Sequence, residues 1–315
     1  MTDIPIISSD FYTGSRGSDF VDLISGLLSR GKLKPKYISL LTNEESMKAY
    51  STAFTAYSFD PINNYERFEQ LGDVTANKFI VWYAYKRFPQ LDCTEGVKVV
   101  ARLRINYGAT KIFSSIGEEL GFWPFISAEI NGTDHNKKYR NRHMKQLLED
   151  VFEAFIGCTE WLLDKAFRTG VGYAIVYDIL LDIFDNRHMS IAYEDLYDSK
   201  TRLKETFDMK KGTIGTWAYT EEKKCSDPES ICMHEIKKSM CAECIKINAL
   251  NVSRVYQIPE GVSNEKYNKG WILIGTGIAS KKIDAEQIAA EEGIVFLKKK
   301  GIYKHPPSIY AFFCA

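Results

Sequence analysis

Carboxylates recur at helical spacing in two apolar segments of the chain. Glu66, Glu69 and Asp73 stand at positions i, i+3 and i+7, which share one face of a helix. Asp150 and Glu153 stand three residues apart and are surrounded by Leu, Val, Phe and Ile. Like charges at these spacings repel, and burial raises the cost of keeping them ionised. Two such helices could hold a divalent cation between them, because hard oxygen ligands suit Mg²⁺ and Mn²⁺.

A solvated acidic face is the alternative to a metal site. For either cluster alone, a solvated face is the more common outcome, since a helix keeps an acidic stripe at little cost when that stripe meets water. Both clusters together, in such apolar surroundings, favour a metal site. Charge and spacing alone leave the two interpretations open.

The residues around the two clusters resemble the signature motifs of the ribonuclease III family. Residues 65–73 read YERFEQLGD, where the family usually has ERLEFLGD. Residues 148–157 read LEDVFEAFIG and are similar to the family's second motif, ADxxEALIG. The intervening residues 94–96 (TEG) and 102–104 (RLR) fall where the family has similar residues. The resemblance extends over residues 20–300.

This resemblance implies an endoribonuclease, a hydrolase that acts on phosphodiester bonds of double-stranded RNA. The matching positions are Glu69, Asp73, Asp150 and Glu153 for the catalytic metal ligands, and Glu66 and Glu95 for further acids lining the catalytic valley of the dimer. Mg²⁺, for which Mn²⁺ can substitute, would activate a water and stabilise charge at the scissile phosphate. The products would carry 5′-phosphate and 3′-hydroxyl ends with short 3′ overhangs. No nucleophilic side chain is needed, and the chain offers no convincing Ser-His-Asp or Cys-His grouping.

Two departures from the family pattern bear on activity. Gln70 stands where the family commonly has Phe, which would loosen packing beside the site. Residues 53–58 read AFTAYS where many members have ALTHRS, so Ala56 replaces a His and the following Arg is also missing. Because none of the four ligands is lost, we expect an active enzyme. The alternative is a catalytically weak or inactive protein that sequesters double-stranded RNA. An acidic helical scaffold with an interaction module is a third possibility, and it would lack metal-dependent affinity for duplex RNA.

The resemblance also implies a homodimer. One site of this kind cuts one strand, and the family cuts both strands by pairing two endonuclease domains about a two-fold axis. Phe79, Trp82 and Tyr83 are candidates for the dimer seam, although ordinary core packing is the more common role for each taken singly.

The chain changes character after residue 207. Residues 213–220, 249–258 and 270–278 are β-branched and aromatic runs typical of strands, and they lie between helical patterns at 198–207 and 281–297. This α-β-β-β-α order, with residues 198–205 and 275–290, resembles a double-stranded-RNA-binding domain. We expect Ser280 to cap the last helix, and Lys281 and Lys282 in its first turn to bind RNA phosphates. A solvated lysine pair is the alternative.

These patterns predict a mainly α endonuclease domain followed by a small α+β domain. The expected divisions are an N-terminal arm at 1–19, the endonuclease domain at 20–190, the RNA-binding domain at 195–304 and a C-terminal tail at 305–315. An insert at 221–248 lies between the first two strands. The insert has four cysteines whose thiols could form a structural zinc site: Cys225, Cys232, Cys241 and Cys244. Free cysteines in an inert insert are an equal alternative.

Composition excludes several other classes of protein. The 315 residues carry 41 Lys plus Arg and 41 Asp plus Glu, so partner preference must come from local charge. The longest apolar run, residues 79–85, is far shorter than the ~20 residues of a membrane span, and the N-terminus lacks a secretory signal pattern. The 7 cysteines, an odd number, favour a reducing compartment. We expect an intracellular, cytoplasmic protein of RNA processing, with no membrane association; the pathway stays open.

Overall fold

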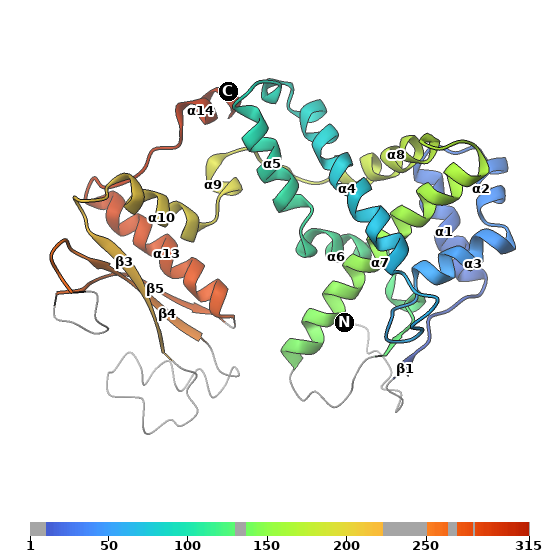
Figure 1. Cartoon of the computed structure of the whole chain (residues 1–315), viewed down its shortest axis with the longest axis horizontal. Coiled ribbons are helices and arrows are strands. Elements are labelled where there is room, and N and C mark those ends of the chain that lie inside the picture. The colour runs from blue at the N-terminus through green and yellow to red at the C-terminus, as the bar shows by residue number, and fades with distance from the viewer. Residues whose placement is uncertain (1–10, 130–136, 223–250, 264–269, 280, 315) are drawn as a thin grey trace. The chain divides into compact units, whose positions relative to one another are not determined.

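The computed structural model describes residues 11–129, 137–222, 251–263, 270–279 and 281–314. These residues divide into two units, Met1–Met189 and Ser190–Ala315, and each unit is described by itself (Figure 1). No helix in the described part of the chain is long and apolar enough to cross a membrane. The cysteines of the predicted zinc site all lie outside the described residues.

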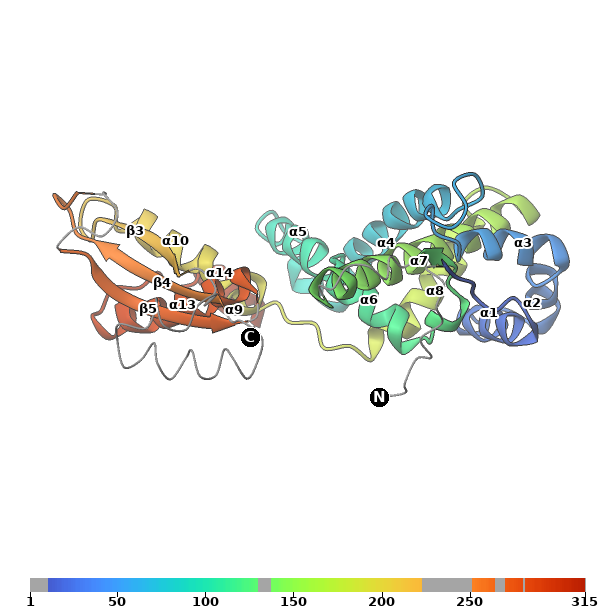
Figure 2. The same ribbon diagram turned by 90° about the horizontal axis from the view of Figure 1, so that it is seen from below.

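The first unit is helical, as its sequence predicts. Its helices are α1 (Ser18–Arg30), α2 (Pro35–Leu41), α3 (Glu44–Ala53), α4 (Glu66–Arg87), α5 (Gly96–Tyr107), α6 (Thr110–Glu119), α7 (Lys137–Ala166) and α8 (Val171–Asp185), with short 3₁₀ turns at Pro89–Leu91 and Trp123–Phe125. Helix α4 ends at Arg87, just before Pro89, because proline disfavours a helical conformation in the residue that precedes it. The longest helices, α4 and α7, pack side by side and form the centre of the unit (Figures 1 and 2).

Aromatic side chains fill the core of this unit. Phe79 and Tyr83 are 0% and 2% exposed, and the Phe79 ring packs on Phe184 and Tyr177 of α8. The prediction of these two residues for the dimer seam is therefore wrong, because their face of α4 is covered by α8. Trp82 lies on another face of the helix and is 61% exposed.

The segment predicted as an N-terminal arm is packed against the helices from residue 11 onward. Strand β1 (Phe11–Tyr12) pairs antiparallel with β2 (Ala128–Glu129). The Arg16 guanidinium then lies over the end of α3. It donates to the Ser51 hydroxyl at 2.7 Å and the Phe54 carbonyl at 3.3 Å, and it also contacts the Phe125 carbonyl. These bonds tie Arg16 to the end of α3 and to the 3₁₀ turn at Trp123–Phe125.

Two glycines allow α4 and α7 to approach closely. A Cβ on Gly72 would lie 1.8 Å from the Glu153 carbonyl oxygen, and a Cβ on Gly157 would lie 2.1 Å from the Phe68 carbonyl oxygen. Neither position can hold a larger residue unless the helix backbones separate. The crossing therefore brings the two acidic motifs of the sequence together.

The second unit contains a three-stranded antiparallel sheet in the order β3-β4-β5. Its elements are α9 (Tyr193–Leu196), α10 (Ser199–Met209), β3 (Thr216–Glu222), β4 (Asn251–Ile258), β5 (Ile272–Ala279), α13 (Lys282–Lys299) and α14 (Ser308–Cys314). The predicted α-β-β-β-α order is thus present. Helices α10 and α13 cover one face of the sheet, and Leu203, Phe207 and Val255 lie in the core between them.

Small residues set the packing of α13 on the sheet. Ala285 and Ala289 are fully buried, and a Cβ on Gly277 of β5 would lie 1.9 Å from the Ala285 carbonyl oxygen. The C-terminal residues, predicted as a tail, include α14, whose Tyr310 ring packs on Tyr193 at 5.3 Å between centroids. The end of the described chain is therefore part of the second unit.

The glycine crossing gives a stability prediction. Gly157→Ala should lower the free energy of unfolding by about 3 kcal/mol, the upper part of the range for overpacking, because its methyl group meets backbone rather than a movable side chain. Gly26→Ala in α1 is the control, since nothing lies within 4 Å of its Cβ position. That variant should be neutral or about 0.5–1 kcal/mol more stable. Urea denaturation measures both, and equal stability of the two variants would contradict the packing argument.

Candidate metal centre

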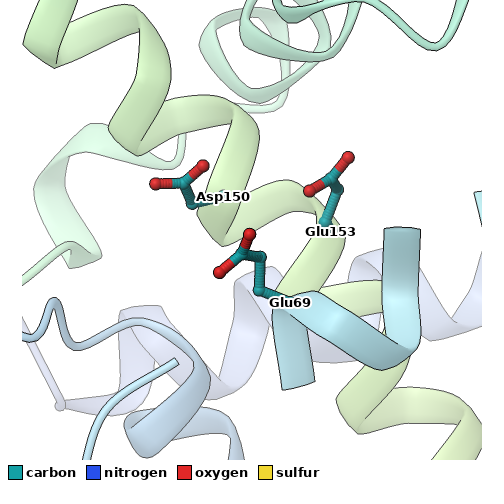
Figure 3. Close-up of side chains that lie close together, drawn as sticks. All are labelled: Glu69, Asp150 and Glu153. Carbon is teal, nitrogen blue, oxygen red and sulfur yellow. The ribbon is translucent and has the colours of Figure 1, made fainter. Parts of the chain in front are cut away.

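Three of the predicted acids converge where α4 and α7 cross. Glu69 comes from α4, and Asp150 and Glu153 come from α7 (Figure 3). Each offers a carboxylate oxygen that lies within 4.8 Å of the other two. Glu69 stands one turn before Gly72, and Glu153 supplies the carbonyl oxygen that Gly72 approaches. The side chains meet because they flank the closest point of the two helices.

Asp73 lies beside this group but is not one of its three members. Its side chain is exposed, and its Oδ1 accepts a hydrogen bond of 2.7 Å from Asn77 Nδ2. Its charge, added to the effect of burial, helps to raise the pKa of both Glu69 and Glu153. Asp73 is therefore an electrostatic neighbour of the three converging carboxyl groups.

Burial and mutual repulsion shift the pKa values of the site upward. Glu153 is 6% exposed, and burial followed by the charges of Asp73 and Glu149 raises its pKa to about 9. Burial and the charge of Asp150 raise the pKa of Glu69 to about 7. These carboxyl groups hold protons more tightly than solvated acids, because no Lys or Arg side chain of the described residues pairs with them to offset the desolvation of their charged forms.

The donor set fits a divalent cation. Three carboxylates are hard oxygen ligands of the kind that Mg²⁺ and Mn²⁺ prefer. Within the described residues, no lysine or arginine forms an ion pair with Glu69, Asp150 or Glu153. A metal ion would supply the positive charge that the side chains themselves do not provide.

The other predicted acids stand apart from the group of three. Glu66 is the first residue of α4 and is exposed, although its charge contributes to the raised pKa of Glu69. Glu95 precedes α5 as its cap residue and is also exposed. Neither is a member of the converging group.

Two residues of the site were given no role by sequence reasoning. Tyr65 immediately precedes α4, and its hydroxyl donates a hydrogen bond of 2.8 Å to Asp150 Oδ2. Burial and the neighbouring Asp150 raise the pKa of Tyr65, so the phenol is the donor. Glu149 is hydrogen-bonded by Thr110, and burial raises its pKa. The sequence feature that could have identified Tyr65 is its position four residues before Glu69, on the same helical face.

The departures from the family pattern have local explanations. Gln70 is exposed on α4, so the predicted loosening of packing beside the site is wrong for this chain. Ala56 is 4% exposed, and its amide donates to the Ser127 carbonyl at 2.8 Å. The Arg16 guanidinium donates to the Phe54 carbonyl and to the Thr55 hydroxyl. Arg16 therefore donates hydrogen bonds to the segment that lacks the family's His and Arg.

Sequence comparison with known proteins places this chain in a protein family. A sequence model described as the ribonuclease III domain matches residues 66–160, which include every member of the converging group. A protein of Invertebrate iridescent virus 6 named "Putative ribonuclease 3" is 38% identical over 315 residues, which is 96% of this chain and 95% of that protein. A protein with the same name from Frog virus 3 is 41% identical over 191 residues, 60% of this chain and 49% of that protein.

A bacterial relative shares the same region. Ribonuclease 3 of Lactobacillus acidophilus is 37% identical over 132 residues, 40% of this chain and 53% of that protein. The matched region spans about half the length of the frog virus and bacterial relatives, whereas the relative from Invertebrate iridescent virus 6 matches almost end to end. The chain belongs to the ribonuclease III family and is a ribonuclease of the endonuclease type.

The raised pKa of Glu153 predicts how stability depends on pH. A carboxyl group whose pKa is raised by folding stabilises the fold fully when the pH is below its ordinary pKa of 4.5. This contribution to stability is lost as the pH rises toward the folded-state pKa of about 9. Glu153→Gln resembles the protonated form and avoids this loss. With EDTA present, the Tm of the unaltered protein should therefore fall below that of Glu153→Gln as the pH increases from 5 to 9. Added Mg²⁺ should raise the Tm of the unaltered protein more than that of the variant. A Tm difference that does not change with pH would contradict the assignment.

Proposed function

We propose that this ribonuclease hydrolyses phosphodiester bonds of double-stranded RNA with the help of Mg²⁺ or Mn²⁺. Glu69, Asp150 and Glu153 would hold the ion, and Asp73, one turn beyond Glu69, would complete the acidic ligand set. The supporting observation is the convergence of three carboxylates to within 4.8 Å, without a basic partner among the described residues. Repulsion within this group makes a divalent ion the favoured counter-charge.

The side chains of the site would position the ion and the RNA. When bound, the metal would activate a water and stabilise charge on the scissile phosphate and the leaving 3′-oxygen. Glu153 is held in a nearly dry position, which strengthens its attraction for a cation. Glu69 and Asp150 approach from opposite helices, so the ion-binding groups are held by two rigid elements rather than by loops. The proposed products have 5′-phosphate and 3′-hydroxyl ends with short 3′ overhangs.

The second unit supports an RNA-binding role. Its α-β-β-β-α order and its alanine-rich α13 match the pattern of a double-stranded-RNA-binding domain predicted from the sequence. Lys281 precedes the first residue of α13, and Lys282 is that residue; both are exposed. Backbone N–H groups at a helix start and ammonium groups together suit phosphate oxygens. The cap position of α13 is held by Lys281, so the prediction that Ser280 caps this helix is wrong. Ser280 lies outside the described residues, and its contact with RNA stays a prediction.

Cleavage and binding can be separated by substitution. Glu153→Gln should abolish Mg²⁺-dependent cleavage of long duplex RNA while binding of the RNA survives, because the ion-binding group is distant in sequence from the phosphate-binding lysines. Glu160→Gln, on the same helix but outside the group of three, is the matched control and should cleave normally. Gel analysis with EDTA as the negative control, and mapping of the fragment ends, measure the outcome.

Substitution of the two lysines of the second unit should affect RNA binding alone. Lys281→Glu combined with Lys282→Glu should weaken duplex RNA binding and flatten its salt dependence, because fewer counterions are released from the RNA.

Undiminished cutting by Glu153→Gln would remove Glu153 from the mechanism. Tight RNA binding by the unaltered protein, without any Mg²⁺-dependent cleavage, would instead favour an RNA-sequestering protein.

An exposed apolar stripe on α4 supports a homodimer. Leu71, Val74 and Trp82 are 43%, 65% and 61% exposed and stand at i, i+3 and i+11 of one helix face. Exposed apolar stripes are typical of protein interfaces. A second copy of this chain is the proposed partner, because two active sites are needed to cut both strands of a duplex.

The oligomeric state tests the dimer. The full chain should sediment as a dimer at micromolar concentration, and Val74→Arg should shift it toward monomer, because a charge then meets an apolar partner surface. Phe312→Arg is the matched control, since Phe312 is 62% exposed in the second unit, and it should leave the dimer intact. A monomeric unaltered protein would overturn the proposed pairing.

A further inference from the structure

Tyr65 connects the start of α4 to the acidic group. Its side chain is half-buried, and its hydroxyl donates to Asp150 Oδ2 over 2.8 Å. Asp150 lies on α7, 85 residues along the chain. This hydrogen bond therefore joins the two helices at the level of the converging carboxylates.

The backbone of Tyr65 is itself tightly held. Its amide donates to the Thr55 carbonyl at 2.9 Å, and its own carbonyl accepts from the amides of Phe68 and Glu69 at 2.8 and 2.9 Å. Thr55 in turn forms a parallel bridge with Ser127 and accepts a hydrogen bond from Arg16. The phenol thus projects from a fixed point, and its position does not depend on a mobile loop.

A hydrogen bond of this kind restricts how a carboxylate can rotate. An ionised carboxylate has two oxygens with about four lone-pair positions, so one accepted hydrogen bond leaves the others for a metal ion. A tyrosine is a neutral donor and leaves the negative charge of Asp150 in place, whereas a lysine or arginine would neutralise it. Groups that orient metal ligands in this way change metal affinity or activity by about 10–100-fold when removed.

We propose that Tyr65 is a positioning residue, which holds the Asp150 carboxylate in the orientation that binds the divalent ion. This inference rests on the proposed metal-dependent function. The competing explanation is that the Tyr65 ring only packs against its surroundings. Tyr65→Phe separates the two, because it keeps the ring and removes only the hydroxyl.

The experiment compares four full-length proteins: the unaltered chain, Tyr65→Phe, Tyr83→Phe and Asp150→Asn. Tyr83 of α4 is the matched control, since its hydroxyl also contacts a carboxylate, that of Asp185 at 3.1 Å, outside the acidic group. Titration calorimetry with Mn²⁺ in the absence of RNA measures ion binding. The Mg²⁺ concentration for half-maximal cleavage and the affinity for duplex RNA in EDTA are measured in parallel.

Tyr65→Phe should weaken Mn²⁺ binding about 10-fold and raise the half-maximal Mg²⁺ concentration by a similar factor, with RNA affinity unchanged. Much of its cleavage rate should return at saturating Mg²⁺, and Tyr83→Phe should behave as the unaltered protein. If Tyr65→Phe binds Mn²⁺ normally while Asp150→Asn binds it poorly, the inference is overturned and the proposed function stands. If the unaltered protein binds no Mn²⁺ and cuts no RNA, the proposed function itself fails.

Discussion

The close crossing of α4 and α7 is the constraint on which the rest of the first unit depends. Gly72 and Gly157 face each other across it, and a methyl group at either would meet backbone at about 2 Å. This crossing places Glu69 opposite Asp150 and Glu153, which are far apart in the sequence. Phe152 and Phe155 of α7 are buried and pack on the Phe122 ring, which anchors this part of the helix in the core. A small change in helix separation would therefore act directly on the distances between the three carboxylates.

Bringing three carboxylates together at the crossing has an electrostatic cost, and this cost is linked to the proposed metal binding. Burial and repulsion raise the pKa of Glu153 to about 9 and that of Glu69 to about 7, so protons compete with a cation for these two carboxyl groups at neutral pH. A chain selected for stability alone would more readily place apolar residues at these buried positions. Here the described contact to Asp150 is a neutral phenol. The proposed divalent ion would therefore displace the protons that Glu69 and Glu153 hold and supply the positive charge itself.

The two units divide the proposed work between catalysis and RNA binding. In the first unit, α4 carries Glu69 on one face and the exposed apolar stripe on another face, so the proposed dimerisation would fix the geometry of two catalytic centres at once. The second unit has a conventional small core, in which Gly277 of β5 allows Ala285 of α13 to lie against the sheet. Its exposed lysines stand at a helix start, where backbone N–H groups also point outward. Shape and phosphate contacts, rather than base sequence, would govern such binding.

Periodicity and motif spacing predicted the helical first unit, the α-β-β-β-α order and the acids of α4 and α7, because these properties depend on residues that are near neighbours in the chain. The burial of Phe79 and Tyr83 could not be predicted, since a helix face is covered or left exposed only by what packs on it, in this case α8. Spacing also could not distinguish Asp73 from the three acids that converge, although all four lie on predicted helices. The long-range side-chain hydrogen bonds of Arg16 and of Tyr65 join residues from 35 to 111 positions apart. Such long-range contacts are decided by tertiary packing, because no local pattern records which distant group will lie within hydrogen-bonding distance.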